Sequence, residues 1–252
     1  MQRNLLSGSQ LAPPPMLSTL LRERSVALFL DFDGTLVDIA QGPDAIMVPE
    51  GLRDHLLQLD AALEGRLALV SGRSLADLER HLGPVPIARA GSHGAECVLG
   101  DGRMIGEPPA PVPQALKAEL AKLEEMHSGL EIEHKSFGIG MHYRAAPDLE
   151  GTIVEQGRIL ASSYGMTIKQ GKCVVELMTA KTDKGRAVRS FMEIEQFAGA
   201  MPVFVGDDIT DEDGFAASGE FDGFGIAVGE REPKLARYHL ASTDAVRSWM
   251  QL

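Results

Sequence analysis

The sequence contains only two cysteines, Cys97 and Cys173, and they lie far apart. They cannot form a disulfide framework, and no Cys/His spacing typical of a zinc site occurs. A reducing environment fits this usage, so we expect a cytoplasmic protein. Long apolar runs are also missing, because none approaches the length of a membrane span and residues 1–16 lack the apolar stretch of a signal peptide. We therefore expect a loose leader over 1–16 and no membrane partner.

Positive charge is scarce as well. The chain has 24 lysines and arginines against 36 aspartates and glutamates, which gives a formal net charge of -12. An acidic chain of this kind repels nucleic acid and anionic membranes, so neither is expected as a partner. If the substrate is an anion, its site must carry local positive charge.

Two common catalytic signatures are absent from the sequence. No GxxxxGK[ST] loop is present to hold the phosphates of ATP, and no nucleophile elbow accompanies a Ser/His/Asp set. ATP-driven chemistry and serine hydrolase chemistry are therefore disfavoured.

The chain does have a short apolar run, Val26–Leu30, which is followed at once by Asp31 and Asp33. A run this short, rich in Val, Leu and Phe, predicts a strand buried on both faces. Two carboxylates at its end lose hydration and repel each other, and magnesium, a hard cation that prefers oxygen ligands, would compensate. The alternative is an ordinary Asp-Gly turn, and this stretch alone does not separate the two interpretations.

Helices and strands alternate over the first part of the chain. We expect them at 17–24 (helix), after Pro49 (amphipathic helix), at 67–70 (strand), from Ser74 to Gly83 (helix) and at 87–90 (strand). This rhythm predicts an α/β fold, with a doubly wound, mainly parallel sheet.

The composition changes at Glu107, where the sequence EPPAPVP indicates a stiff linker. The order then becomes helix, strand, strand, helix, strand, strand, at 114–126, 130–135, 138–144, 149–162, 166–169 and 173–178. This order predicts a small α+β domain with an antiparallel sheet, inserted into the larger one. We expect a core domain at 17–106 and 180–252 and an inserted domain at 107–179.

The first rhythm returns after the insertion. The pattern predicts a helix over 184–197 capped by Asp183, strands at 202–205 and 225–228, and a closing helix that contains Trp249.

Polar residues follow three of the apolar strands. They are Asp31 with Asp33, then Ser71, then Asp207 with Asp208. Ligands of open α/β sheets bind at the carboxyl ends of the strands, so these residues should meet at one edge, where Lys184 and the start of its helix would add positive charge. This inventory of carboxylates, a hydroxyl, an ammonium group and backbone N–H groups is what phosphoryl transfer requires.

A carboxylate is the nucleophile that remains once the other signatures are excluded, and it would give an aspartyl-phosphate intermediate. Asp31 is the better nucleophile because it is nearest the strand. Asp33 can protonate the leaving oxygen as a general acid and then activate water as a general base.

Four stretches in the right order resemble the motifs of the haloacid-dehalogenase (HAD) superfamily of phosphatases: DFDGTL at 31–36, SGR at 71–73, Lys184 and GDDITDED at 206–213. Further stretches are similar to trehalose-6-phosphate phosphatases: VSGRS at 70–74, GSHGAE at 91–96, IEHK…MHYR at 132–144, GKCVVEL at 171–177 and FVGDDITDEDGF at 204–215. The insertion resembles the superfamily's α/β cap of the βαββ-type class. The resemblance covers about 26–228 and implies a HAD-like core with a cap, and a Mg2+-dependent phosphatase that hydrolyses trehalose 6-phosphate to trehalose and phosphate.

The resemblance also implies roles for individual residues. Asp31 would be the nucleophile and Asp33 the acid/base, while Ser71 and Lys184 would hold the phosphoryl group. Magnesium would be bound by Asp31, the backbone carbonyl of Asp33, and Asp207, with Asp208 and Asp211 at or next to the metal. The implied substrate-binding residues are Gly34, Arg73, Glu133, Lys135, Arg144, Lys172 and Glu176.

Several alternatives stay open at this point. The protein could act on another sugar phosphate, or it could be a phosphomutase of the same superfamily. It could also be a phospho-receiver module, which Asp33 and the inserted domain disfavour. The charged positions of the inserted domain could form cross-strand ion pairs on a solvated sheet face, and Arg73 could pair with an acid on the neighbouring helix. We expect a monomer whose partner is a small-molecule sugar phosphate.

Overall fold

The computed structural model describes residues 11–39, 46–107, 110–135, 137–171, 173–179 and 182–251. The chain divides into two compact units, Met1–Gly106 with Asp183–Leu252, and Glu107–Thr182. Of the expected leader, residues 1–10 lie outside the described part, and residues 11–16 form neither helix nor strand.

The first unit is built on a seven-stranded sheet in the order β11-β10-β9-β1-β2-β3-β4. Every neighbouring pair in it is parallel except β3 and β4. The strands are β1 Val26–Leu30, β2 Leu67–Val70, β3 Ala88–Gly91, β4 Glu96–Val98, β9 Met201–Gly206, β10 Phe224–Val228 and β11 Tyr238–Leu240.

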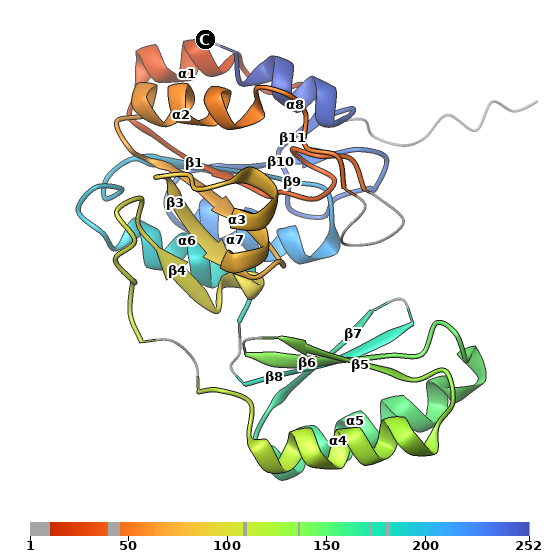
Figure 1. Ribbon diagram of the computed structural model, residues 1–252. Coiled ribbons are helices and arrows are strands. Elements are labelled where there is room, and N and C mark those ends of the chain that lie inside the picture. The colour runs from red at the N-terminus through yellow and green to blue at the C-terminus, as the bar shows by residue number, and fades with distance from the viewer. Residues whose placement is uncertain are drawn as a thin grey trace, which may run out of the picture. The chain divides into compact units, whose positions relative to one another are not determined.

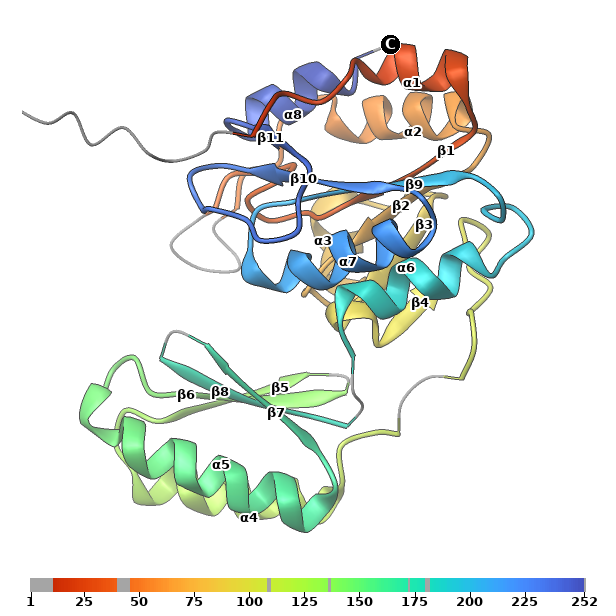
Figure 2. The same cartoon turned by 180° about the vertical axis from the view of Figure 1, so that it is seen from behind.

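Helices cover both faces of this sheet (Figures 1 and 2). They are α1 Leu17–Glu23, α2 Leu52–Ala62, α3 Leu75–Leu82, α6 Lys184–Met192, α7 Glu212–Glu220 and α8 Thr243–Trp249. Alternate residues of β1 point to opposite layers. Val26, Leu28 and Leu30 pack with α1, α2, α3 and α8, whereas Ala27 and Phe29 pack with α6 and α7.

Side-chain caps fix where three of these helices begin. Ser74 accepts the backbone N–H of Asp77, Asp183 that of Arg186, and Ser242 that of Ala245, at 3.1, 2.7 and 3.2 Å. Helix α6 ends at Met192 rather than at 197, because short-range turn bonds follow it. These turns bring Phe197 against the rings of Phe29 and Phe191.

The second unit is a four-stranded antiparallel sheet in the order β5-β6-β8-β7 with two helices on one face (Figure 1). Its elements are α4 Gln114–Met126, β5 Glu131–Lys135, β6 Gly138–His142, α5 Glu150–Tyr164, β7 Thr167–Gly171 and β8 Val174–Met178. Leu116, Leu120 and Ile153 of the helices pack against Ile139 and Val175 of the sheet. This is the α+β order that the sequence pattern predicts.

The predicted fold class, a mainly parallel α/β sheet with an inserted α+β unit, is confirmed. Three elements of the first unit were not predicted, namely β4, β11 and α7. The two strands have three residues each and α7 contains two glycines, so none shows a strong hydrophobic period. Within the described residues, no helix is both long and apolar enough to cross a membrane.

Candidate active site

The carboxyl ends of β1 and β9 lie side by side near the middle of the sheet. The two strands pair in parallel with Leu30 opposite Val205, and the N–H of Asp31 donates to the carbonyl of Val205 at 2.9 Å. The chain continues from β1 to one side of the sheet and reaches β9 and β10 on the other, which makes this the switch point where α/β proteins bind ligands. Asp31 and Asp207 therefore leave the sheet at the same place.

Lys184, the first residue of α6, connects two carboxylates of this region. Its Nζ donates to Asp31 Oδ1 at 2.7 Å and to Asp211 Oδ1 at 2.6 Å. All three residues are buried, with Lys184 and Asp31 each 3% exposed and Asp211 0%. Buried charges persist only when they are paired and hydrogen-bonded, and here one ammonium serves two carboxylates.

Asp31, Asp207 and Asp211 form an acidic cluster in which one carboxylate oxygen of each lies within 4.8 Å of the others. Burial raises the pKa of Asp31 to about 6, against the attraction of Lys184 and with added repulsion from Asp207. Burial, with repulsion from Asp211, also raises the pKa of Asp207 to about 6. Burial and repulsion from Asp31 raise the pKa of Asp211 to about 7.

The shift in the pKa of Lys184 favours the charged form of this side chain, whereas the shifts of the aspartates favour their neutral forms. Burial alone would lower the pKa of Lys184, but the attraction of Asp31 and Asp211 outweighs burial and raises the pKa above its ordinary value. Two aspartates face the single positive charge of Lys184, so the cluster keeps an excess of negative charge when both are ionised. Such an arrangement of oxygen donors suits a hard divalent cation.

Thr35 links two members of the acidic cluster. Its hydroxyl is fully buried and lies 3.3 Å from Asp31 Oδ2 and 3.4 Å from Asp207 Oδ1. Gly34, directly before it, has a φ of +80°, and a Cβ there would lie 2.7 Å from Asp207 Oδ1. The turn after β1 therefore packs so tightly on Asp207 that only glycine fits at 34.

Asp33 is turned toward a different partner. Arg73 Nε and Nη2 donate to its two carboxylate oxygens at 2.6 and 2.7 Å. Arg73 Nη1 donates to Asp77 Oδ2 of α3 at 2.5 Å, and the guanidinium also lies over the ring of Phe32. The Arg73 side chain is 10% exposed, so these contacts are shielded from water.

Ser71 directly follows β2 at the same edge of the sheet. It is 1% exposed, and its hydroxyl accepts the backbone N–H of Arg73 at 3.1 Å. The N–H of His93 donates to the carbonyl of Ser71 at 2.9 Å. The imidazole of His93 lies over Gly72, where a Cβ would come 2.7 Å from the ring. The turn after β3 thus packs against the SGR stretch.

Asp208 occupies a different position from the other aspartates. Its side chain is exposed and accepts the backbone N–H of Asp211, while Asp211 Oδ2 accepts the N–H of Asp208 at 2.8 Å. These reciprocal bonds form a capping box around a short 3₁₀ turn, Ile209–Asp211. Among the described residues, the structure groups Asp211 rather than Asp208 with Asp31 and Asp207.

The second unit brings together three of the predicted substrate-binding residues. Lys135 pairs with Glu176 and lies 3.5 Å from Glu133. The imidazole Nε2 of His142 lies 2.8 Å from Oε2 of Glu133. Burial acts against the charge of Lys135, but the two glutamates outweigh it and raise its pKa. These side chains lie on the face of the sheet opposite to α4 and α5, because Ile132 and Ile139 fill the helix-covered face.

Two predicted substrate-binding residues of this unit remain, Arg144 and Lys172. Arg144 is exposed in the turn after β6. Lys172 lies outside the described residues. Thr35 and His142 were not predicted as site residues, although both fall inside stretches that carry the resemblance. His142 is separated from Glu133 by nine positions along the chain and meets it only through strand pairing.

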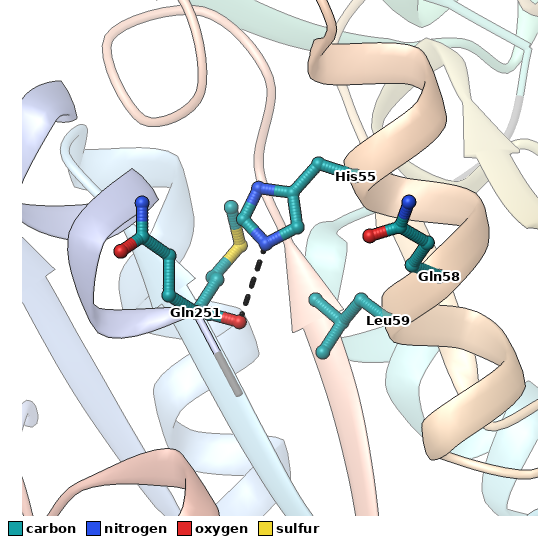
Figure 3. Close-up of a pocket in the computed structure, with 5 residues that line it drawn as sticks. His55, Gln58, Leu59 and Gln251 are labelled. Carbon is teal, nitrogen blue, oxygen red and sulfur yellow. Dashed lines mark hydrogen bonds between the residues drawn. The ribbon is translucent and has the colours of Figure 1, made fainter.

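A surface pocket elsewhere on the first unit does not contribute to this chemistry. It encloses about 410 Å³ between α2 and the end of α8, and its lining residues are His55, Gln58, Leu59, Met250 and Gln251 (Figure 3). The imidazole of His55 contacts the carbonyl of Met250 at 3.4 Å. None of the five lining residues carries a carboxylate, an ammonium or a guanidinium group.

The sequence matches a family model. The model described as trehalose-phosphatase matches residues 29–244. The chain is 34% identical over 241 residues to the trehalose-6-phosphate phosphatase of Escherichia coli (strain K12), and the match covers 94% of this chain and 90% of that protein.

Solved structures are similar as well. A trehalose-6-phosphate phosphatase related protein has a TM-score of 0.72 and 26% identity, with 90% of this chain and 95% of that chain covered. A phosphatase of the HAD superfamily from Bacteroides thetaiotaomicron has a TM-score of 0.63 and 17% identity, with coverage of 98% and 97%. At that identity the likeness concerns the fold alone, and it confirms the predicted HAD-like fold.

Proposed function

The chain belongs to the trehalose-phosphatase family, a family of phosphoric monoester hydrolases, and on this basis we propose that it hydrolyses trehalose 6-phosphate to trehalose and phosphate. The observation that carries the proposal is the convergence of Asp31, Asp207 and Asp211 around Lys184 at the switch point of the sheet. The expectations of a cytoplasmic location and a monomer stay predictions.

The acidic cluster fits a magnesium ion. Three carboxylates supply hard oxygen ligands, and their pKa values are raised first by burial and then by mutual repulsion, which a divalent cation would relieve. Asp31, Asp207 and Asp211 would hold the ion. A bound Mg2+ supplies charge neutralisation for the phosphoryl oxygens.

Asp31 is the nucleophile of the proposed reaction. A carboxylate oxygen of Asp31 attacks phosphorus, the bond from phosphorus to the sugar oxygen breaks, and an aspartyl phosphate forms. Lys184, which stays an ammonium, and the Ser71 hydroxyl donate hydrogen bonds to the phosphoryl oxygens. The phosphoryl group thus moves between a buried carboxylate and the substrate in a field of fixed donors.

Asp33 acts as the general acid of the first half-reaction and as the general base of the second. In the first it donates a proton to the leaving sugar oxygen. In the second its carboxylate removes a proton from water, the water oxygen attacks the aspartyl phosphate, and phosphate leaves with Asp31 regenerated. Asp33 is 34% exposed, so it is accessible to substrate and water.

The second unit supplies the residues that recognise the sugar. Glu133, Lys135 and Glu176 are joined in one hydrogen-bonded cluster with fixed donors and acceptors, and such groups suit a ligand rich in hydroxyls. Gly140 lies between Glu133 and Glu176 in the strand register, so the middle of this face has no side chain at that position.

Phosphate release from a panel of sugar phosphates, with Mg2+ and with EDTA, tests the substrate. We expect release from trehalose 6-phosphate only with Mg2+. Release from a different sugar phosphate but not from trehalose 6-phosphate would overturn the substrate. Accumulation of an isomeric sugar phosphate in place of free phosphate would identify a phosphomutase.

Two substitutions test the roles of the residues. D31N should abolish turnover, and full activity in this variant would overturn the mechanism. E176Q should raise KM for trehalose 6-phosphate and leave the hydrolysis of p-nitrophenyl phosphate, which has no sugar, unchanged. An equal effect on both substrates would contradict a role of the second unit in sugar recognition.

A further inference from the structure

The loop after β10 contacts the loop that carries Asp207. Arg231 Nε donates to the backbone carbonyl of Asp207 at 3.0 Å, and its Nη1 donates to Glu212 Oε1 at 2.7 Å. Glu212 is the first residue of α7 and is 9% exposed. A single guanidinium thus binds both the backbone beside the acidic cluster and the start of the next helix.

Glu212 holds Arg231 and its loop in place. Its carboxylate also accepts the backbone N–H groups of Lys234 at 3.0 Å and Leu235 at 2.9 Å. Burial acts to raise the pKa of Glu212, but these N–H groups and Arg231 outweigh it and lower the pKa. The glutamate is therefore an anion that anchors the loop at Arg231 and again at Lys234 and Leu235.

The peptide group between Asp207 and Asp208 is fixed at both of its polar atoms. Arg231 binds its carbonyl, and Asp211 Oδ2 accepts its N–H at 2.8 Å. Because a peptide group is planar, fixing both atoms fixes the orientation of the Asp207 backbone. The Cα of Asp207, from which the carboxylate side chain extends, lies in this plane and is held with it.

The same bonds connect Arg231 to the centre of the site. Asp211 Oδ1 accepts from Lys184, and Lys184 also donates to Asp31. A continuous chain of hydrogen bonds therefore runs from Arg231 through the Asp207–Asp208 peptide, Asp211 and Lys184 to Asp31. Arg231 lies outside the motifs that carry the family resemblance.

We propose that Arg231 is a positioning residue for the cation site, which it serves by holding the Asp207–Asp208 peptide that aims the Asp207 carboxylate. The inference rests on the proposed function, because it takes Asp31, Asp207 and Asp211 as the ligands of a divalent cation. Residues that orient metal ligands typically contribute about 10–100-fold to metal affinity. R231A should therefore weaken cation binding about 10-fold.

Cation binding is measured on the substrate-free protein with Mn2+, whose free ion is counted by electron paramagnetic resonance. The wild type is compared with R231A, R231K and D207N. The matched control is R189A, because Arg189 binds Glu220 at the other end of α7 through two bonds of 2.6 and 2.8 Å. We expect R189A to bind like the wild type and D207N to lose binding. R231K should bind several-fold more weakly, because lysine cannot bond to Asp207 and Glu212 with one planar group.

The outcomes separate this inference from the proposal beneath it. Wild-type Mn2+ affinity in a folded R231A would overturn the positioning role alone, and a lower melting temperature in that variant would then report only a structural contact. If R231A does not fold, wild-type affinity in R231K would overturn the role in the same way. A wild-type protein that binds no Mn2+ would overturn the cation site and this inference together.

Discussion

Arg73 binds both carboxylate oxygens of Asp33, at 2.6 and 2.7 Å, and binds Asp77 of α3 with its remaining nitrogen at 2.5 Å. The proposed acid/base is therefore oriented by a residue that is itself held by a helix. Both oxygens of the Asp33 carboxylate are thus engaged by one guanidinium. To reach a leaving group, Asp33 must first free an oxygen from Arg73.

R73K tests whether Arg73 orients Asp33. Lysine keeps the charge but cannot form the two-pronged bond, so Asp33 would lose its fixed orientation. Because acid/base catalysis contributes about 10²–10⁴-fold, we expect kcat for trehalose 6-phosphate to fall about 10-fold or more. Steady-state kinetics of wild type and variant measure this.

The control for this prediction is R80A. Arg80 also donates to Asp77, at 2.6 Å, but its side chain is 57% exposed, so kcat should stay unchanged. The resemblance implies a substrate contact for Arg73 instead. A higher KM with an unchanged kcat in R73K would support that role and contradict the positioning of Asp33.

K184M should lower the free energy of unfolding by an amount that depends on pH. At pH 8 the substitution leaves Asp31 and Asp211 buried without a counter-charge, which costs about 3–5 kcal/mol. Their pKa values are already raised to about 6 and about 7 in the folded protein, above the unfolded value of 3.8. A group whose pKa is raised on folding stabilises the folded protein fully at pH values below its unfolded pKa. This stabilisation is lost as the pH rises through the folded pKa. At pH 5 both groups carry protons and the loss should be smaller.

Urea unfolding in EDTA at pH 5 and pH 8 checks this dependence. The control is R189A, which removes an exposed cation of the same helix and should have a small effect at both pH values. An equal loss in K184M at the two pH values would contradict the shared pairing of Lys184 with the two aspartates.

Local sequence signals determined much of this fold. Val26–Leu30 is a strand with the predicted bounds, and Ser74 and Asp183 cap the helices that follow them. These features depend on short-range chemistry, namely an apolar run or a side chain that accepts a nearby N–H. The topological rule on strand ends was sufficient to predict that Asp31 and Asp207 lie together.

Other parts of the site depend on contacts that the sequence pattern does not encode. Asp207, Asp208 and Asp211 are chemically alike, and only the capping box decides that Asp211 joins the cluster while Asp208 faces solvent. Arg231 reaches Asp207 across 24 positions of the chain through a loop with no periodic pattern. Such contacts arise from tertiary packing and were not predicted.

Magnesium should stabilise the wild-type protein more at pH 8 than at pH 5. The pKa values of Asp31, Asp207 and Asp211 are raised to about 6, about 6 and about 7, so below pH 6 protons occupy the oxygens that would bind the cation. Above pH 7 the carboxylates are ionised and repel each other without a cation. The increase in melting temperature on adding Mg2+ in place of EDTA should therefore grow from pH 5 to pH 8, as thermal unfolding measures. D207N should abolish the increase, and an increase that is larger at pH 5 would contradict the acidic cluster as the binding site.

Gly34 and Gly51 allow the close packing around Asp207 to be separated from backbone strain. Both have a left-handed backbone, with φ of +80° and +78°. An alanine at either position costs about 1–2 kcal/mol because an L-residue is strained there. A Cβ at Gly51 would meet nothing within 4 Å, whereas a Cβ at Gly34 would overlap the Asp207 carboxylate.

G51A should therefore lose about 1–2 kcal/mol of stability and keep its activity. G34A should lose at least as much stability, and its kcat/KM should also fall about 10²-fold. Asp207 must move to make room for the methyl group, and a displacement of about 1 Å in a catalytic constellation has an effect of that size. Urea unfolding and kinetics of the two variants, measured side by side, check the prediction. The backbone strain of an L-residue is common to both variants, and only the contact with Asp207 differs between them. Equal activities of G34A and G51A would therefore mean that the turn at Gly34 adjusts without moving Asp207.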